Sequence, residues 1–189
     1  MTATVEERQE LLSDLMAAAG RIAGTGFDGG ARPGPEIVLA LDPGTRETGW
    51  AIVDTGMKTD ETLAAWRQLF AGATDGKRLS RIFATHMHPD HIGMAGWLTR
   101  KFGIRLWMTR LEYMHCRVLM ADTGREAPDA AVTFYHRAGW TDAAIENYRA
   151  RFGNFGKNIH PLPASFKRIS DGHSFPIGAH RWQVVVGTD

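Results

Sequence analysis

Three histidines and an aspartate lie within six residues of one another near the middle of the chain: His86, His88, Asp90 and His91. Imidazole and carboxylate groups are costly to gather in one place unless they share a cation. Side chains of an extended segment alternate with a period of two, so His86 and His88 point the same way and can bind one ion. Asp90 and His91 follow where the chain bends, and this second pair can reach a neighbouring ion. The segment therefore predicts a site for two divalent metal ions.

The ligand types also indicate the metal and its chemistry. Imidazole with carboxylate suits zinc best, with iron or manganese as alternatives. Two such ions about 3.5 to 4 Å apart can share a hydroxide, lower its pKa toward neutrality and polarise a scissile carbonyl or phosphoryl oxygen. A metal-bound hydroxide needs no serine or cysteine nucleophile. We assign the catalytic role to Asp90, as a ligand that also orients the nucleophile, and we expect Cys116 to be a small buried hydrophobe.

The elements that position this cluster are predicted from periodicity and turn residues to be strands alternating with helices. Strands are expected at 37–41 and 50–53, as a hairpin, and at 81–85, 104–108 and 182–186; a second hairpin is expected from 166–169 and 174–177 around Asp171 and Gly172. Helices are expected at 60–72, 92–102, 109–120, 127–138 and 141–151. The order predicts an α/β layered fold in which the histidine cluster follows the carboxyl end of a strand.

Composition limits the class of protein. The 189 residues with 43% hydrophobic content suit one packed domain, and 22 Lys and Arg against 21 Asp and Glu give a net charge of +1. No overall field therefore favours nucleic acid or a membrane surface, and we expect a small-molecule substrate. No apolar run approaches the roughly 20 residues that span a bilayer. One cysteine excludes an internal disulfide framework, and with no secretory signal apparent we expect the cytoplasm.

The first 35 residues are expected to stand apart from the domain that carries the cluster. Thr4 and Glu7 form a capping-box pattern, and apolar residues recur at helical spacing as far as Ile22, so residues 4–23 predict an amphipathic helix. Residues 24–35 are rich in glycine and proline and predict a linker. We therefore divide the chain into residues 1–35, a helix with its linker, and residues 36–189, the metal-binding domain.

The segment from Thr85 to Gly93 resembles the H-x-H-x-D-H motif of the metallo-β-lactamase superfamily. Upstream, residues 53–56 resemble the family's first motif, in which the aspartate, here Asp54, supports the ligands without touching the metal. The resemblance covers residues 37–189 and implies an αββα sandwich of two similar halves with the metals between them. The chain would supply the first half, part of the second and a helical insert.

Within that superfamily, residues 90–98, 106–109 and 135–140 resemble hydrolases of the hydroxyacylglutathione-hydrolase (glyoxalase II) type. This resemblance implies hydrolysis of a thioester or ester. Two alternatives stay open. Some relatives use a single iron to oxidise persulfides, and the chain is otherwise explained as an inactive, truncated metal-binding fragment.

The resemblance also implies ligands that the sequence does not supply. His86 and His88 would share the first ion with a third histidine, and Asp90 and His91 would share the second with a later aspartate and histidine. The third histidine is expected directly after a strand like 184–187, yet the sequence stops at Asp189. We expect the native product to continue, or a second chain, such as another copy, to cover an otherwise buried strand at 184–186 and complete the site. His173 is the alternative third ligand.

Overall fold

The computed structural model describes residues 38–42, 49–72, 78–177 and 180–187. The predicted helix at 4–23 and the linker to residue 35 lie outside these residues, so the proposed boundary near residue 36 stays a prediction. No helix in the described part of the chain is long and apolar enough to cross a membrane.

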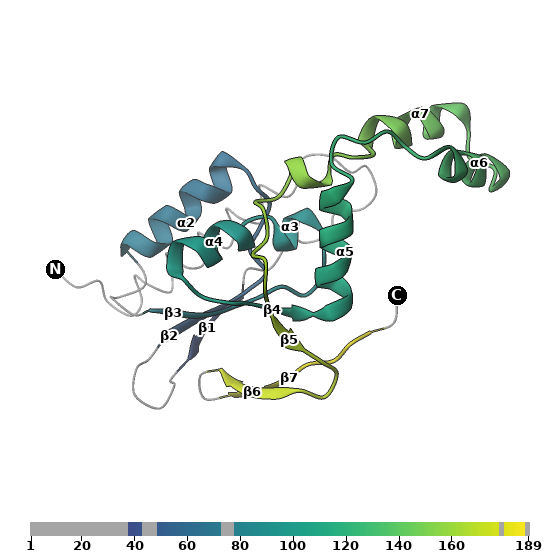
Figure 1. Ribbon diagram of the computed structural model, residues 1–189. Coiled ribbons are helices and arrows are strands. Elements are labelled where there is room, and N and C mark those ends of the chain that lie inside the picture. Colours follow the sequence, from purple (N-terminus) through teal and green to yellow (C-terminus); the bar gives the residue numbers. More distant parts are fainter. Residues whose placement is uncertain (1–37, 43–48, 73–77, 178–179, 188–189) are drawn as a thin grey trace.

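A five-stranded sheet in the order β1-β2-β3-β4-β5 forms the middle of the molecule (Figure 1). Its first pair is antiparallel, which confirms the predicted first hairpin, and the remaining pairs are all parallel. The parallel order places the carboxyl ends of neighbouring strands at one edge of the sheet, where open α/β sheets carry their sites. The strands are β1 (Val38–Asp42), β2 (Gly49–Val53), β3 (Leu79–Phe83), β4 (Leu106–Thr109) and β5 (Lys167–Ile169).

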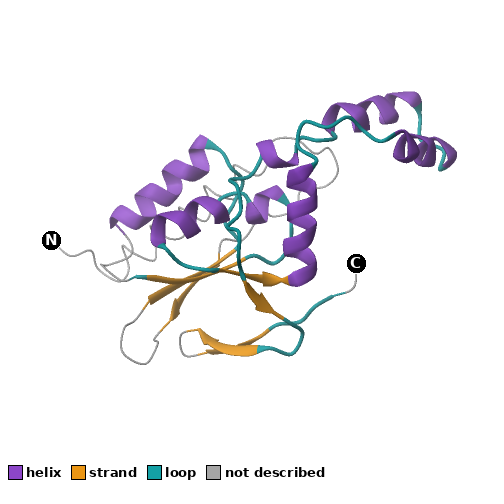
Figure 2. Cartoon of the chain, in the orientation of Figure 1, coloured by secondary structure: helices purple, strands orange, loops and turns teal. Residues whose placement is uncertain are grey.

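Helices cover one face of this sheet, and a two-stranded sheet lies against the other (Figure 2). The helical layer consists of α2 (Asp60–Gly72), α3 (Pro89–Ile92), α4 (Ala95–Phe102) and α5 (Arg110–Ala121). The main core fills the space beneath it, with fully buried Ile52, Ile82, Leu98 and Met108. On the opposite face, β6 (Ser174–Ile177) and β7 (His180–Gln183) enclose a smaller apolar cluster.

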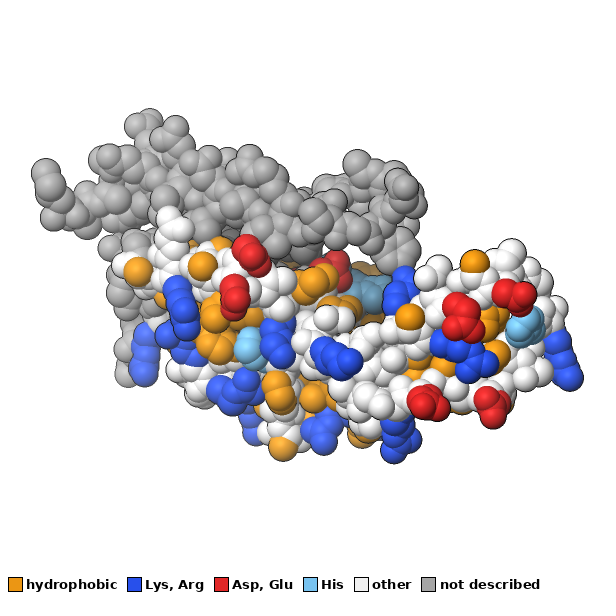
Figure 3. Space-filling model, turned by 90° about the horizontal axis from the view of Figure 1, so that it is seen from above, with side chains coloured by type: hydrophobic (Ala, Val, Ile, Leu, Met, Phe, Trp, Pro, Cys, Tyr) orange, Lys and Arg blue, Asp and Glu red, His pale blue; other side chains and the backbone are white. Residues whose placement is uncertain are grey.

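Two helices form an arm that projects from the body (Figure 1). They are α6 (Asp129–Arg137) and α7 (Asp142–Arg151), and a short 3-10 turn, η1 (Phe155–Lys157), follows them. The arm has its own small core around Val132 and Ile145, bordered by stacked aromatic rings. Seen from above, acidic and basic side chains are mixed on the arm, whereas Lys and Arg predominate on the visible part of the body (Figure 3). The predicted helical insert is present.

Two predictions about elements are wrong in detail. The predicted helix at 92–102 starts only at Ala95, because the chain turns after Ile92, which is the last residue of the separate short helix α3. The turn at Asp171 and Gly172 exists, but it does not close a hairpin: β5 pairs with β4, and β6 pairs with β7. A local turn signal cannot report which strand lies next to β5 in the sheet.

The strand predicted at 182–186 and buried on both faces is also wrong. The strand ends at Gln183, and Val185 is 82% exposed. Val184 pairs through its backbone with the turn at residues 172 and 173, after which the chain leaves the sheet. Apolar, β-branched residues favour a strand, but they do not become buried where no described element packs over them.

Candidate metal centre

The candidate ligands gather at the carboxyl edge of the parallel sheet. Asp54 is the first residue after β2, the histidine segment follows β3, and α5 starts directly after β4. Backbone bonds join these segments, since Asp54 N–H donates to the Phe83 carbonyl and Ala84 N–H donates to the Trp107 carbonyl. The predicted placement of the cluster beyond a strand's carboxyl end is confirmed, but only His86 and His88 lie on the loop, whereas Asp90 and His91 lie in the short helix α3.

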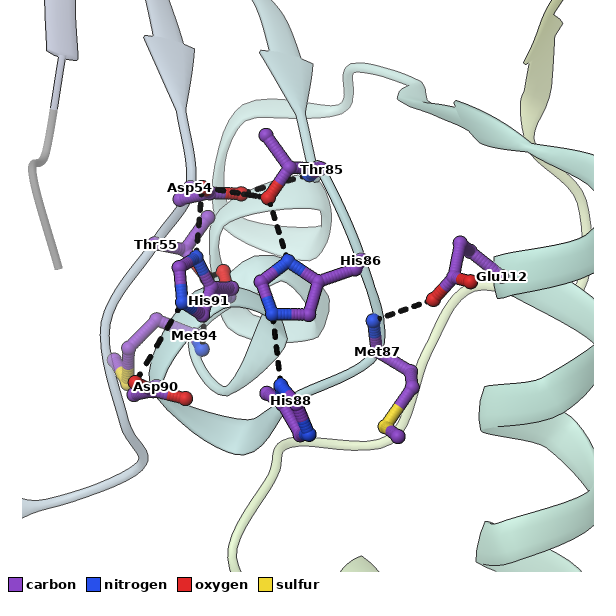
Figure 4. A network of polar contacts seen from close by, with 10 residues as sticks. All are labelled: Asp54, Thr55, Thr85, His86, Met87, His88, Asp90, His91, Met94 and Glu112. Carbon is purple, nitrogen blue, oxygen red and sulfur yellow. Dashed lines mark hydrogen bonds and ion pairs between the residues drawn. The ribbon is translucent and has the colours of Figure 1, made fainter. Parts of the chain in front are cut away.

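The side chains of His86 and His88 converge, as the sequence predicts (Figure 4). Nε2 of His86 lies 2.8 Å from Nδ1 of His88. The ring of His91 lies beside that of His86, with 4.0 Å between their centroids, and Nε2 of His91 faces a carboxylate oxygen of Asp90 at 3.6 Å. The loop and α3 thus present two adjacent pairs of donor atoms: two imidazoles on the loop, and an imidazole and a carboxylate on α3.

Asp54 is the buried anchor of this arrangement, 6% exposed. Its carboxylate accepts hydrogen bonds from the Thr85 backbone N–H at 2.8 Å, from the Thr85 hydroxyl at 2.8 and 3.0 Å, and from Nδ1 of His91 at 2.8 Å. The role expected for this aspartate, support of the ligands through hydrogen bonds, matches these contacts.

Asp54 also determines which ring nitrogens carry protons. An ionised carboxylate only accepts hydrogen bonds, so the contacts to His91 Nδ1 and to the Thr85 hydroxyl must be donated to it. The Thr85 hydroxyl, having spent its one proton, then accepts from Nδ1 of His86 at 2.9 Å. In both His86 and His91 the proton therefore sits on Nδ1, and the lone pair of Nε2 points into the cluster, where a cation would bind.

The pKa values of His86 and His91 are shifted in opposite directions. Burial lowers the pKa of His86, and the neighbouring His91 and His88 lower it further, which outweighs the attraction of Asp54 and Asp90. Burial also lowers the pKa of His91, but the hydrogen bond and charge of Asp54, together with the charge of Asp90, outweigh burial and raise that pKa above its usual value. His86 is thus held in the neutral form that binds metal, whereas a cation must displace a proton from His91 more often.

Backbone contacts fix the far side of the loop. The carbonyl of His91 accepts from Thr55 N–H at 2.7 Å and from the Thr55 hydroxyl at 2.9 Å. Gly93 lies where three backbones meet: a Cβ on it would come within 2.5 Å of the Pro89 carbonyl oxygen and 2.6 Å of the Gly56 carbonyl oxygen. Only glycine allows this approach, which brings the loop after β2 against the start of the helical layer.

The donor set fits a pair of divalent cations in kind and in position, but it supplies two donors to each. Two ligands of one tetrahedral zinc ion lie about 3.3 Å apart, so a separation of 2.8 Å needs only a slight opening. Within the described segments, no three His, Cys, Asp or Glu side chains converge as a closed metal site requires. The pairs formed by His86 with His88 and by Asp90 with His91 are therefore the residues that would hold the ions.

Other candidates from the sequence lie elsewhere. His173 packs on the ring of Phe175 beside β6, and no contact joins it to the cluster. Cys116 is buried in α5, where burial and the charge of Glu112 raise the pKa of its thiol to about 12. It is a core residue, as expected, and not a nucleophile.

Three residues around the site were missed by sequence reasoning. Thr55 and Thr85 adjoin Asp54 and His86, so their positions beside motif residues were the available signal. Glu112, whose carboxylate accepts from the Met87 N–H at 2.8 Å, lies far from the motif in sequence. The sequence indicated only that Glu112 lies near the start of a helix that directly follows a strand, here α5 after β4.

Comparisons with known proteins agree with this geometry. The description "Metallo-beta-lactamase superfamily" belongs to the family profile that matches residues 38–168. A beta-lactamase domain protein from Burkholderia ambifaria is 31% identical, with a TM-score of 0.65 over 79% of this chain and 42% of its own. A metallo-beta-lactamase family protein from Thermus thermophilus is 21% identical, with a TM-score of 0.53 over 78% of this chain and 44% of its own, and shows the fold alone.

A search of curated proteins finds no match. The chain spans less than half the length of either of these solved structures. Because the family profile covers well over half of the chain, and the sheet, the helical layer and the loop after β3 follow the expected fold, the chain belongs to the metallo-beta-lactamase superfamily.

Proposed function

We propose that this chain is the metal-binding part of a hydrolase that acts on a thioester or ester, of the glyoxalase II-like type. His86 with His88 would hold one divalent cation, and Asp90 with His91 would hold a second, with zinc as the expected metal. The observation that carries the proposal is the set of hydrogen bonds around Asp54, because it leaves Nε2 of His86 and of His91 free of a proton, one toward each proposed cation.

Cations bound there would acidify water and polarise the carbonyl of a substrate. The chain's own residues contribute position and charge. Asp54 is buried and fully hydrogen-bonded to Thr85 and His91, so it holds the loop and keeps both Nδ1 atoms protonated. The side chain of Asp90 is 38% exposed and lies beside His91 Nε2, so it is placed both to bind a cation and to accept a hydrogen bond from an attacking water.

The choice of thioester or ester rests on the resemblance of residues 90–98, 106–109 and 135–140 to hydrolases of that type. The net charge of +1 provides no overall basic field that would favour a nucleic acid substrate. A small acyl thioester of glutathione is accordingly the first substrate to test.

The test combines metal content with turnover. Metal-free protein is dialysed against zinc, analysed for bound metal, and assayed for hydrolysis of a hydroxyacyl glutathione thioester. We expect zinc uptake by the wild type and reduced uptake, through loss of the ion held by His86 and His88, in the double variant His86→Ala, His88→Ala. The exposed His115 of α5 provides the matched control, and His115→Ala should bind zinc as the wild type does.

Equal zinc uptake by the wild type and the double variant would show that the cluster is not the metal site. Selective uptake of one iron, with oxygen consumed in the presence of a glutathione persulfide, would replace the hydrolase by the oxidising alternative. Zinc uptake together with turnover of a lactone, a β-lactam or a phosphodiester, and none of a thioester or ester, would retain the metal site and refute the substrate.

A further inference from the structure

The loop that carries the first two histidines is held by side chains on both of its flanks. Between the end of β3 and the start of α3, residues 84–88 have no regular secondary structure. The N–H of Thr85 donates to Asp54, and the N–H of Met87 donates to Glu112, both at 2.8 Å. Alternate amides of the loop are thus taken up by two carboxylates.

The sheet order explains why these two carboxylates flank the loop. β3 lies between β2 and β4. Asp54 follows β2 immediately, and Glu112 lies in the first turn of α5, which follows β4 immediately. The hydrogen bonds between the strand backbones stop where the strands end. Beyond that point, the carboxylates that follow β2 and β4 accept hydrogen bonds from the amides of the loop after β3. Figure 4 shows the two carboxylates on opposite sides of the histidine loop.

Glu112 acts on the peptide that matters most for the first donor pair. Met87 stands between His86 and His88, so the orientation of its backbone determines the directions in which both imidazoles leave the chain. One helical turn after Glu112, the thiol of Cys116 lies 4.0 Å from the Met87 carbonyl oxygen. Residues four apart share one face of a helix, so this face of α5 contacts the N–H and the C=O of Met87 together.

The start of α5 leaves Glu112 available for this contact. The Thr109 hydroxyl accepts from the Glu112 N–H at 3.3 Å and caps the helix, which is half of a capping box. In the full box the glutamate would turn back to the N–H of the capping residue. The hydrogen bond found for this carboxylate within the described chain runs instead to Met87.

We infer that Glu112 is a positioning residue of the metal centre: it fixes the Met87 peptide, and through it the convergence of His86 and His88, without touching the metal. The inference rests on the proposed function. A residue in this role changes metal affinity by about 10–100-fold when it is removed, although it is not a ligand.

The test uses variants that separate the length of the Glu112 side chain from its charge. Glu112→Ala removes the acceptor, Glu112→Asp keeps the charge and the favourable first-turn position but shortens the side chain, and Glu112→Gln keeps an acceptor oxygen at the same reach. Leu111→Ala is the matched control, because Leu111 is the preceding residue of the same helix and is 75% exposed.

Two quantities are measured: hydrogen exchange of the Met87 amide in metal-free protein, and the zinc dissociation constant by competition with a chromophoric chelator. We expect the Ala and Asp variants to speed exchange roughly tenfold or more and to weaken zinc binding about 10–100-fold. The Gln variant and the Leu111→Ala control should stay close to wild type in both. Exchange of the Ile82 amide, within β3, should be unchanged throughout.

Wild-type exchange and wild-type zinc affinity in the Glu112→Asp variant would overturn the inference, and this variant decides the matter if Glu112→Ala does not fold. Faster exchange with unchanged zinc affinity would also overturn it, since the contact would then be structural only. A wild type that takes up no zinc refutes the proposed function and, with it, the effect on metal affinity. Because exchange is measured without metal, the two failures are distinguishable.

Discussion

Replacing Asp54 by alanine should destabilise the metal-free protein more than any other single change at the site. Its buried carboxylate accepts from the Thr85 N–H and from His91 Nδ1, and hydrogen bonds to a charged group contribute about 1.5–3 kcal/mol each. Asp54 also has a φ of +58°, a left-handed conformation that costs alanine about 1–2 kcal/mol. Together these give a loss of roughly 4–8 kcal/mol, a large share of the 5–15 kcal/mol typical of a domain.

Asp54→Asn separates the contribution of the carboxylate's hydrogen bonds from that of the left-handed backbone. Asparagine tolerates the left-handed backbone and keeps one acceptor oxygen, so we expect it to lose about half as much free energy of unfolding as alanine does. The assay is urea unfolding, followed by tryptophan fluorescence. The control is Asp142→Ala, whose side chain is 94% exposed on α7, and its free energy of unfolding should change by no more than about 0.5 kcal/mol.

The raised pKa of His91 determines how the free energy of unfolding should depend on pH. The pKa of His91 is raised in the folded protein, so the extra stability that the charged imidazole gains from Asp54 contributes fully below the ordinary value of 6.5 and is lost as the pH rises through the folded pKa. The difference in stability between wild type and Asp54→Asn should therefore narrow above about pH 6.5 and leave the contributions of Thr85 and of the neutral His91 Nδ1–H. A loss below about 1 kcal/mol for Asp54→Ala, or a difference that widens with rising pH, would refute this account.

Three further predictions concern neighbouring residues. Asp90→Ala should lower the free energy of unfolding by less than about 1 kcal/mol yet abolish hydrolysis and reduce bound zinc, as measured by unfolding, turnover and metal analysis; near-normal turnover with full metal content would contradict its role. Gly93→Ala should cost about 2–4 kcal/mol in urea unfolding, because its Cβ would meet three backbone atoms within 2.7 Å, whereas Gly187→Ala, in open space, should be neutral. At about pH 8, Cys116 should react with a thiol reagent only after unfolding, since a pKa near 12 leaves it about a thousandfold less thiolate than an ordinary thiol.

Local pattern was enough to predict most of the elements and the first ligand pair. The period-two spacing of His86 and His88 predicts that they share a direction, and the alternation of strands and helices predicts an α/β layered fold in which they follow the carboxyl end of a strand. Both depend on residues close together in sequence. The partner of β5 could not be predicted in this way, because strand pairing is decided by the whole sheet.

The hydrogen bond from the Met87 N–H to Glu112 could not be predicted either, because it also depends on the order of the strands in the sheet. Glu112 is 25 residues from Met87, and only the order of β3 and β4 in the sheet brings them together. The run at 184–186 led to the opposite error, because it predicted a buried strand that the structure does not contain. Its composition favours a buried strand, but burial depends on what packs over it, and composition carries no information about that.

Asp54 shows how backbone and chemistry together leave one residue type at a position. Where β2 ends, the left-handed φ turns its carboxylate back across the sheet edge, and this backbone favours glycine, asparagine or aspartate. Glycine offers no acceptor. Three donors converge on the side chain, the Thr85 amide, the Thr85 hydroxyl and His91 Nδ1, and an asparagine amide would turn one of its own donors toward them. Only aspartate meets both conditions, so this residue fixes the protonation of two candidate ligands and the path of the chain at once.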